Sequence, residues 1–220
     1  MPHRPPPGPE VNAPATGQRR PLVLASGNAG KLIELRALLA DLPFEVIGQA
    51  SLGVRPPQET ETTFVGNALL KAWHAARATG YAALADDSGL EVDALGGAPG
   101  VHSARYAGPQ ASDAENNAKL IAALRGVPPA RRTARYRCAL AFVQGPHDPA
   151  PLIAEAAWEG VILEQPRGSG GFGYDPYFGV PELGRSAAEL TQEHKNALSH
   201  RGRALGRLHE LLSGAAVMRR

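Results

Sequence analysis

Apolar and polar positions along the chain alternate between the spacing of strands and the spacing of helices. The run from Leu22 to Ala25 is typical of a short buried strand, and Phe44 to Gln49 has the character of a second one. A helix is predicted from about Thr63 to Thr79, because its apolar residues form one stripe and Gly80 can end it. Between the two strands, leucines at helical spacing predict another helix: Leu32, Leu35, Leu38, Leu39 and Leu42.

The second half of the chain predicts two long strands and then helices. Apolar residues alternate with polar or small ones from Arg135 to Phe142 and from Leu152 to Trp158, which indicates two adjacent antiparallel strands. A short third strand is expected from Val161 to Leu163. Helix starts are marked by two Ser-x-x-Glu capping boxes, Ser112 with Glu115 and Ser186 with Glu189, and the last helix carries Leu205, Leu208 and Leu212.

The segment from Tyr81 to Tyr106 is the one around which these elements are arranged. A strand from Ala82 to Ala85 is expected to deliver Asp86 and Asp87 onto a Ser-Gly turn, and a second strand, Leu90 to Val92, leads away. Two carboxylates this close both ionise only if a cation or a proton lies between them. Taken alone, the two acids favour an ordinary solvated turn.

Composition sets the class of protein. The 220 residues are 43% hydrophobic and 20% charged with a net charge of +2, which fits one globular domain and argues against a dedicated nucleic-acid binder. The single Cys138 fits a reducing cytoplasm, and no apolar run approaches the about 18 residues of a membrane span. We expect a disordered Pro-rich leader over residues 1–20, one domain over residues 21–214 and a tail over residues 215–220.

Three further stretches carry candidate chemistry, each with a plainer structural alternative. A loop between the first strand and helix, Ser26 to Lys31, is typical of an anion site, because glycines and a helix start expose backbone N–H groups. The glycine-rich stretch from Arg167 to Pro176 could stack a base on its aromatic rings, or it is an Ω-loop pinned by them. A basic cluster, Lys195, Ser199, His200 and Arg201, could hold phosphate or base edges, although such a cluster is usually a solvated face.

Five motifs, collinear from about Leu22 to Leu212, resemble those of the inosine triphosphate pyrophosphatases, which hydrolyse non-canonical purine nucleoside triphosphates. The motifs are SGNAGK with Glu34 following, ETETTFVGNALLKA, ADDSGLEVDALGGAPGVHSARY, GGFGYDPYF and ELTQEHKNALSHRGRAL. The resemblance implies a two-lobed α/β fold around a long mixed sheet with flanking helices and a nucleotide cleft between the lobes. It also implies a homodimer, Mg²⁺, and cleavage of substrates such as ITP, dITP and XTP between the α and β phosphates.

The same resemblance implies roles for individual residues. Asp87 is the implied catalytic acid and also a metal ligand, with Glu59 and Asp86 as the other carboxylates for the metal. The remaining implied positions bind substrate: Ser26, Gly27, Asn28, Ala29, Gly30, Lys31, Ser88, Phe172, Gly173, Tyr174, Asp175, Lys195, His200 and Arg201.

Some questions stay open at the level of sequence. The family often has two adjacent acids before a Thr, and only the second remains in Gln58-Glu59-Thr60, so Glu59 and Glu61 compete as the loop metal ligand. The preferred base and sugar, the number of metal ions and the dimer surface are not specified. A pyrophosphatase for modified pyrimidine nucleotides and a non-catalytic nucleotide sensor are the alternative functions.

Overall fold

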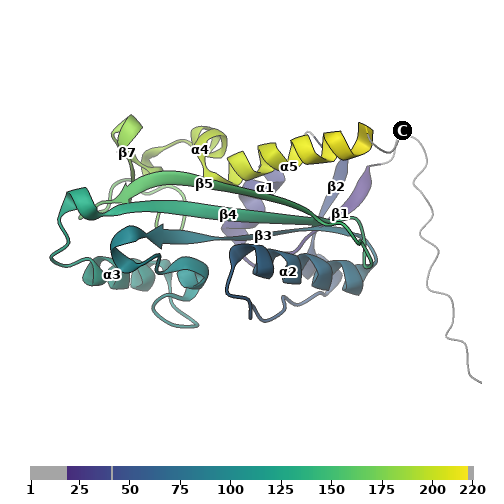
Figure 1. The fold of residues 1–220 in the computed structure, drawn as a ribbon, viewed down its shortest axis with the longest axis horizontal. Helices are drawn as coiled ribbons and strands as arrows, with labels where there is room; N and C mark the ends of the chain where they lie inside the picture. The colour runs from purple at the N-terminus through teal and green to yellow at the C-terminus, as the bar shows by residue number, and fades with distance from the viewer. Residues whose placement is uncertain (1–18, 41, 218–220) are drawn as a thin grey trace, which may run out of the picture.

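The computed structural model describes residues 19–40 and 42–217, which form a seven-stranded mixed sheet in the order β2-β1-β3-β4-β5-β6-β7 (Figure 1). β1 runs parallel to both β2 and β3, and every later pairing is antiparallel. The predicted mixed sheet is therefore confirmed, whereas its division into two lobes stays a prediction. The strands are β1 (Arg20–Leu24), β2 (Phe44–Gly48), β3 (Ala82–Val92), β4 (Thr133–Val143), β5 (Leu152–Ile162), β6 (Phe178–Val180) and β7 (Arg185–Ser186).

Five α-helices flank the sheet in the described part of the chain, and their ends follow the capping signals of the sequence. Thr63 caps α2 through its side chain, Gly80 ends that helix with a positive φ, and the box at Ser112 and Glu115 starts α3. The helices are α1 (Ala29–Leu38), α2 (Phe64–Thr79), α3 (Asp113–Ala123), α4 (Gln192–Leu198) and α5 (His200–Val217). Short 3₁₀ turns lie at Gln49–Leu52, Asp93–Leu95, Gly100–Arg105, Pro129–Arg131, Pro181–Leu183 and Ala187–Glu189.

Opposite faces of the central strands pack against different helices. α2 covers one face of β3 and β4, where small residues such as Ala85 and Ala139 let the helix approach closely, and α5 covers the opposite face of the sheet at β4 and β5 (Figure 1). On that second face Leu84 and Leu140 pack with α1 and α5. Because successive side chains of a strand point to opposite faces, neighbouring residues of β3 enter different environments.

β3 corrects the prediction of a turn after Ala85. The strand continues unbroken to Val92, because every residue from Ala83 to Val92 is paired with a residue of β4. Gly89 is needed for space and not for a turn: a Cβ there would collide with the carbonyl of Gly100 and with Ser103 Oγ. Ser103 Oγ in turn accepts a hydrogen bond from Leu90 N.

The other boundary predictions differ in smaller ways. The short third strand expected at Val161 is wrong, because β5 runs continuously to Ile162. Residues 1–18 of the expected leader lie outside the described residues, and Arg20 already belongs to β1. At the other end α5 reaches Val217, past the expected domain end at residue 214. Among the described helices, none has the length and apolar character needed to cross a membrane.

Candidate active site

The loop after β1 is a capped helix start that lies against the glycine-rich stretch from Arg167 to Pro176, the aromatic loop. Asn28 Oδ1 accepts from Lys31 N at 3.0 Å, and Ser26 Oγ accepts from Asn28 N at 3.2 Å. A Cβ on Gly30 would lie 2.8 Å from the ring of Phe172. Gly30 therefore makes room for this ring, in addition to any backbone approach by a phosphate.

Six charged side chains form a continuous network on the face of β3 that carries Asp86. Three cations alternate with three carboxylates, and each of the six side chains is at most 14% exposed. Because every charge is paired, the cluster is tolerated in the interior. Lys31 contacts Asp86 (2.6 Å), Asp86 contacts Arg201 (2.9 Å), and Arg201 contacts Glu34. Glu34 also contacts Lys195 (2.9 Å), which in turn contacts Asp175 (2.6 Å).

The pKa values on this face follow from burial and pairing. Burial alone would raise the pKa of Asp86, but Arg201 and Lys31 outweigh it and hold the value well below its usual range. Burial, reinforced by the charge of Arg201, lowers the pKa of His200 well below 6.5. The His200 ring is thus neutral; it stacks on Tyr136 at a centroid distance of 4.8 Å, and its Nδ1 is a buried atom without a hydrogen-bond partner.

The aromatic loop separates its two rings into different roles. Phe172 lies next to cations, with Lys195 Nζ 4.7 Å and Arg201 Cζ 5.9 Å from its ring centroid. Tyr174 is buried and donates its hydroxyl to Ser103 O at 2.8 Å, so it anchors the loop. Asp175 accepts from Phe172 N and from the Tyr136 hydroxyl, and burial raises its pKa despite the charge of Lys195.

Asp87 begins a second, smaller network on the opposite face of β3. Lys71 Nζ of α2 lies 2.6 Å from Asp87 Oδ1 and 2.9 Å from Glu59 Oε1, and Arg105 holds the other oxygen of Glu59 at 2.8 Å. Burial raises the pKa of Asp87 although Lys71 opposes it, whereas Lys71 and Arg105 overcome burial at Glu59 and lower its pKa to about 2. Asp87 Oδ2 is buried and has no hydrogen-bond partner, so it is available to a ligand.

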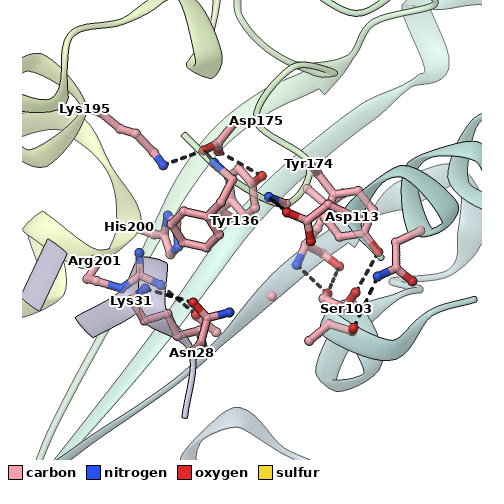
Figure 2. Close-up of a pocket in the computed structure, with 17 residues that line it drawn as sticks. Asn28, Lys31, Ser103, Asp113, Tyr136, Tyr174, Asp175, Lys195, His200 and Arg201 are labelled. Carbon is pink, nitrogen blue, oxygen red and sulfur yellow. Dashed lines mark hydrogen bonds and ion pairs between the residues drawn. The ribbon is translucent and has the colours of Figure 1, made fainter. Parts of the chain in front are cut away.

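Lys31 connects the two networks. It is paired with Asp86, and its charge also acts on Asp87 and on Glu59. A pocket begins beside it. Figure 2 shows Lys31, Lys195, His200 and Arg201 on one side of this pocket and Ser103, Asp113 and Tyr174 on the other. Cations of the buried network therefore line one side of the pocket, and α3 and the turn that carries Ser103 close the other.

The structure does not bring all three predicted metal ligands together. Glu59 and Asp87 converge on one point, now held by Lys71, whereas Asp86 lies on the other face and is fully engaged by Lys31, Arg201, Ser88 and Cys138. Within residues 19–40 and 42–217 no group of three His, Cys, Asp or Glu side chains is placed to hold a metal. The carboxylates of Glu59 and Asp87, the latter with its unpartnered Oδ2, still fit Mg²⁺, which is commonly bound by one or two carboxylates together with substrate phosphates.

Several residues of the site were not predicted. Lys71 of α2 was given no role, because a lysine on an amphipathic helix is usually at the surface, whereas this one is only 6% exposed. Glu34 is a buried acid on the leucine-rich face of α1, a pattern that could have indicated an internal ion pair. Tyr136, Asp113 and Asn116 also line the pocket, and no local signal in the sequence connects them to it.

Comparison with known proteins identifies the family. The model of the Ham1 family matches residues 22–211, nearly the whole described chain. The chain belongs to the Ham1 family. A Ham1-family relative from Methylococcus capsulatus, named dITP/XTP pyrophosphatase, is 62% identical over 84% of this chain and 92% of its own length. A protein of the same name from Yersinia pseudotuberculosis is 56% identical over 88% of this chain and 98% of its own.

Solved Ham1-family structures have the same fold. A HAM1 protein from Coxiella burnetii aligns with a TM-score of 0.82 at 50% identity, covering 89% of this chain and 99% of its own. A dITP/XTP pyrophosphatase from Mycobacterium abscessus aligns with a TM-score of 0.69 at 43% identity, covering 86% and 97%. The resemblance carried by the five sequence motifs is thereby confirmed at the level of family and fold.

Proposed function

We propose that this Ham1-family protein is a nucleoside triphosphate pyrophosphatase that hydrolyses non-canonical purine nucleotides such as dITP, XTP and ITP. The products are the nucleoside monophosphate and pyrophosphate. Support comes from the relatives named dITP/XTP pyrophosphatase and from the pocket that joins Phe172 to buried cations. Assembly as a homodimer and a reducing cytoplasmic location, in keeping with the free thiol of Cys138, belong to the same proposal.

The phosphate chain is expected to lie near Lys31, where the start of α1 adds positive potential. Asp87 is the proposed base: its Oδ2 is unpartnered, its pKa is raised, and Lys71 fixes the other oxygen. The carboxylate would orient a water molecule and take its proton as the water attacks the α phosphorus. Mg²⁺ held by Glu59 and Asp87 with phosphate oxygens would neutralise charge on the departing pyrophosphate.

The base is expected to enter the pocket beside Phe172, whose ring can stack on a purine. Inosine and xanthine present O6 where adenine presents an amino group, so a hydrogen-bond donor at this position favours them. Arg201 uses three of its five N–H groups on Asp86, Glu34 and Ser88, which leaves donors for a ligand. The neutral ring of His200 can donate as well.

One observation carries the proposal: Lys31 lines the recognition pocket, and its charge also acts to lower the pKa of Asp87 against the effect of burial. The test is to incubate the protein with Mg²⁺ and ITP, dITP, XTP, GTP, ATP or dTTP, and to assay pyrophosphate and orthophosphate separately. We expect pyrophosphate chiefly from ITP, dITP and XTP, and at least a hundredfold loss of turnover in Asp87→Asn. Orthophosphate as the first product, a preference for dTTP, or full turnover by Asp87→Asn would each overturn it.

A further inference from the structure

The tip of the aromatic loop is tied to helix α3 through both polar groups of one backbone residue. Gly173 N donates to Asp113 Oδ2 at 2.6 Å, and Asn117 Nδ2 donates to Gly173 O at 2.8 Å. Asp113 and Asn117 are four positions apart in α3 and therefore lie on the same face of the helix. Helix α3 thus holds the residue that directly follows Phe172.

Contacts within the loop hold Phe172, whose N–H donates to Asp175 Oδ2 and whose carbonyl accepts from Asp175 N, whereas the polar groups of Gly173 are bound by α3. Gly168, Gly171 and Gly173 all have positive φ values, between 63° and 72°, a region in which glycine has unusual freedom. Gly173 φ is 63°, and no atom lies within 4 Å of where its Cβ would be, so side-chain packing does not hold this residue. The two hydrogen bonds from α3 therefore add a restraint at Gly173 to the one that Asp175 places on Phe172.

The restraint acts across the recognition pocket. Asp113 lies beside Tyr174 on the side of the pocket opposite Lys195 and Arg201 (Figure 2). Phe172 contacts those two cations and packs over Gly30. Fixing Gly173 therefore fixes where the Phe172 ring stands relative to the opposite wall.

We propose that Asp113 and Asn117 are positioning residues that set the affinity of the pocket for its base by clamping Gly173, and hence Phe172. The inference rests on the proposed function only in taking the pocket as the base site. Asp87 and Lys71 lie on the other face of β3 and share no hydrogen bond with this clamp. Loss of the clamp should thus weaken base binding and leave the hydrolytic step almost unchanged.

The perturbation is Asp113→Ala, which removes a carboxylate that is exposed at the start of α3 and is not needed for the core. Asp113→Asn keeps a side-chain oxygen that can accept from Gly173 N. Lys119→Met is the matched control, because Lys119 lies on the same helix and donates to Tyr106 O instead of to Gly173. Asn117→Ala, alone and combined with Asp113→Ala, tests whether the two residues act on the same target.

Two measurements are made on each variant. The first is hydrogen–deuterium exchange of the Gly173 amide in the free protein, which we expect to be at least tenfold faster in Asp113→Ala. The second is binding of inosine monophosphate by calorimetry, where we expect an about tenfold larger Kd, equivalent to about 1.4 kcal/mol. Asp113→Asn should recover most of both effects, Lys119→Met should match the wild type, and the double variant should cost less than the sum of its singles.

The outcomes separate this inference from the proposed function. Exchange or binding in Asp113→Ala that stays within twofold of the wild type would overturn the clamp, whatever the enzyme hydrolyses. A fall in kcat for ITP with unchanged KM would also overturn it. If the wild type hydrolyses no nucleotide but binds inosine monophosphate, and the variant binds it tenfold more weakly, the proposed function fails and the clamp stands.

Discussion

Glu34 balances the charge of the buried network, and replacing it by Gln tests whether that balance sustains the fold. In the native protein Lys31, Lys195 and Arg201 face Glu34, Asp86 and Asp175, three charges of each sign. Glu34→Gln keeps the shape of the side chain but leaves one positive charge without compensation. Lys195 and Arg201 both lose the carboxylate that they contact.

The expected cost follows from the geometry and from burial. At 2.9 Å, the pair of Glu34 and Lys195 is attracted by about 6 kcal/mol if the effective dielectric constant is about 20. Removing the carboxylate also removes the cost of burying it, so the net loss for a broken buried pair is about 3–5 kcal/mol. For a chain of this size each kcal/mol lowers Tm by about 2–4 °C, which predicts a fall of roughly 6–20 °C.

Urea unfolding followed by circular dichroism, together with a thermal scan, measures this loss. The control is Glu45→Gln, an exposed carboxylate on β2, which should change the free energy of unfolding by less than about 0.5 kcal/mol. The reasoning is refuted if Glu34→Gln, with an unchanged m-value, costs less than about 1 kcal/mol, because the network would then contribute no more than surface pairs do.

Two further predictions concern Lys71 and His200. In Lys71→Met, Glu59 and Asp87 lose the cation between them, which leaves room for a metal ion. Adding Mg²⁺ alone should therefore raise the Tm of this variant by several degrees and that of the wild type by about 1 °C or less. Equal shifts in the two proteins would contradict this. His200 stays neutral in the folded protein, so below pH 6.5 the unfolded chain takes up a proton that the native protein does not. The free energy of unfolding therefore falls by at most about 1.4 kcal/mol for each pH unit that the pH is lowered. Between pH 6.5 and pH 5, His200→Gln should lose stability less steeply than the wild type; identical slopes would refute the assignment.

The elements of the fold were largely predictable because the signals that define them are local. Apolar spacing located β1, β2 and α2, and caps such as Gly80 and Ser112 gave helix ends within one or two residues. The unbroken β3 was missed because Asp, Ser and Gly favour turns in isolation. Pairing with β4 along the whole strand overrides that preference.

The site was predictable in its members more than in its arrangement. The motifs supplied Lys31, Phe172 and Arg201, which line one pocket, but they do not say that Asp86 and Asp87 face different helices. That fact depends on β3 continuing through both acids, because successive side chains of a strand point to opposite faces, and it is pairing with β4 that continues the strand. Lys71 and Glu34 were missed for a related reason: whether a polar residue on a helix is buried depends on what covers it.

The side-by-side carboxylates of β3 also bear on how this enzyme can change over evolutionary time. The sheet is a partition, with proposed recognition on the side of α5 and proposed bond cleavage on the side of α2. Substitutions among residues that pack on one side can alter which base is accepted without touching the groups that break the bond. An insertion or deletion of a single residue within β3 would exchange the two acids between compartments and disable both at once, so the length of this strand should tolerate far less variation than its neighbours do.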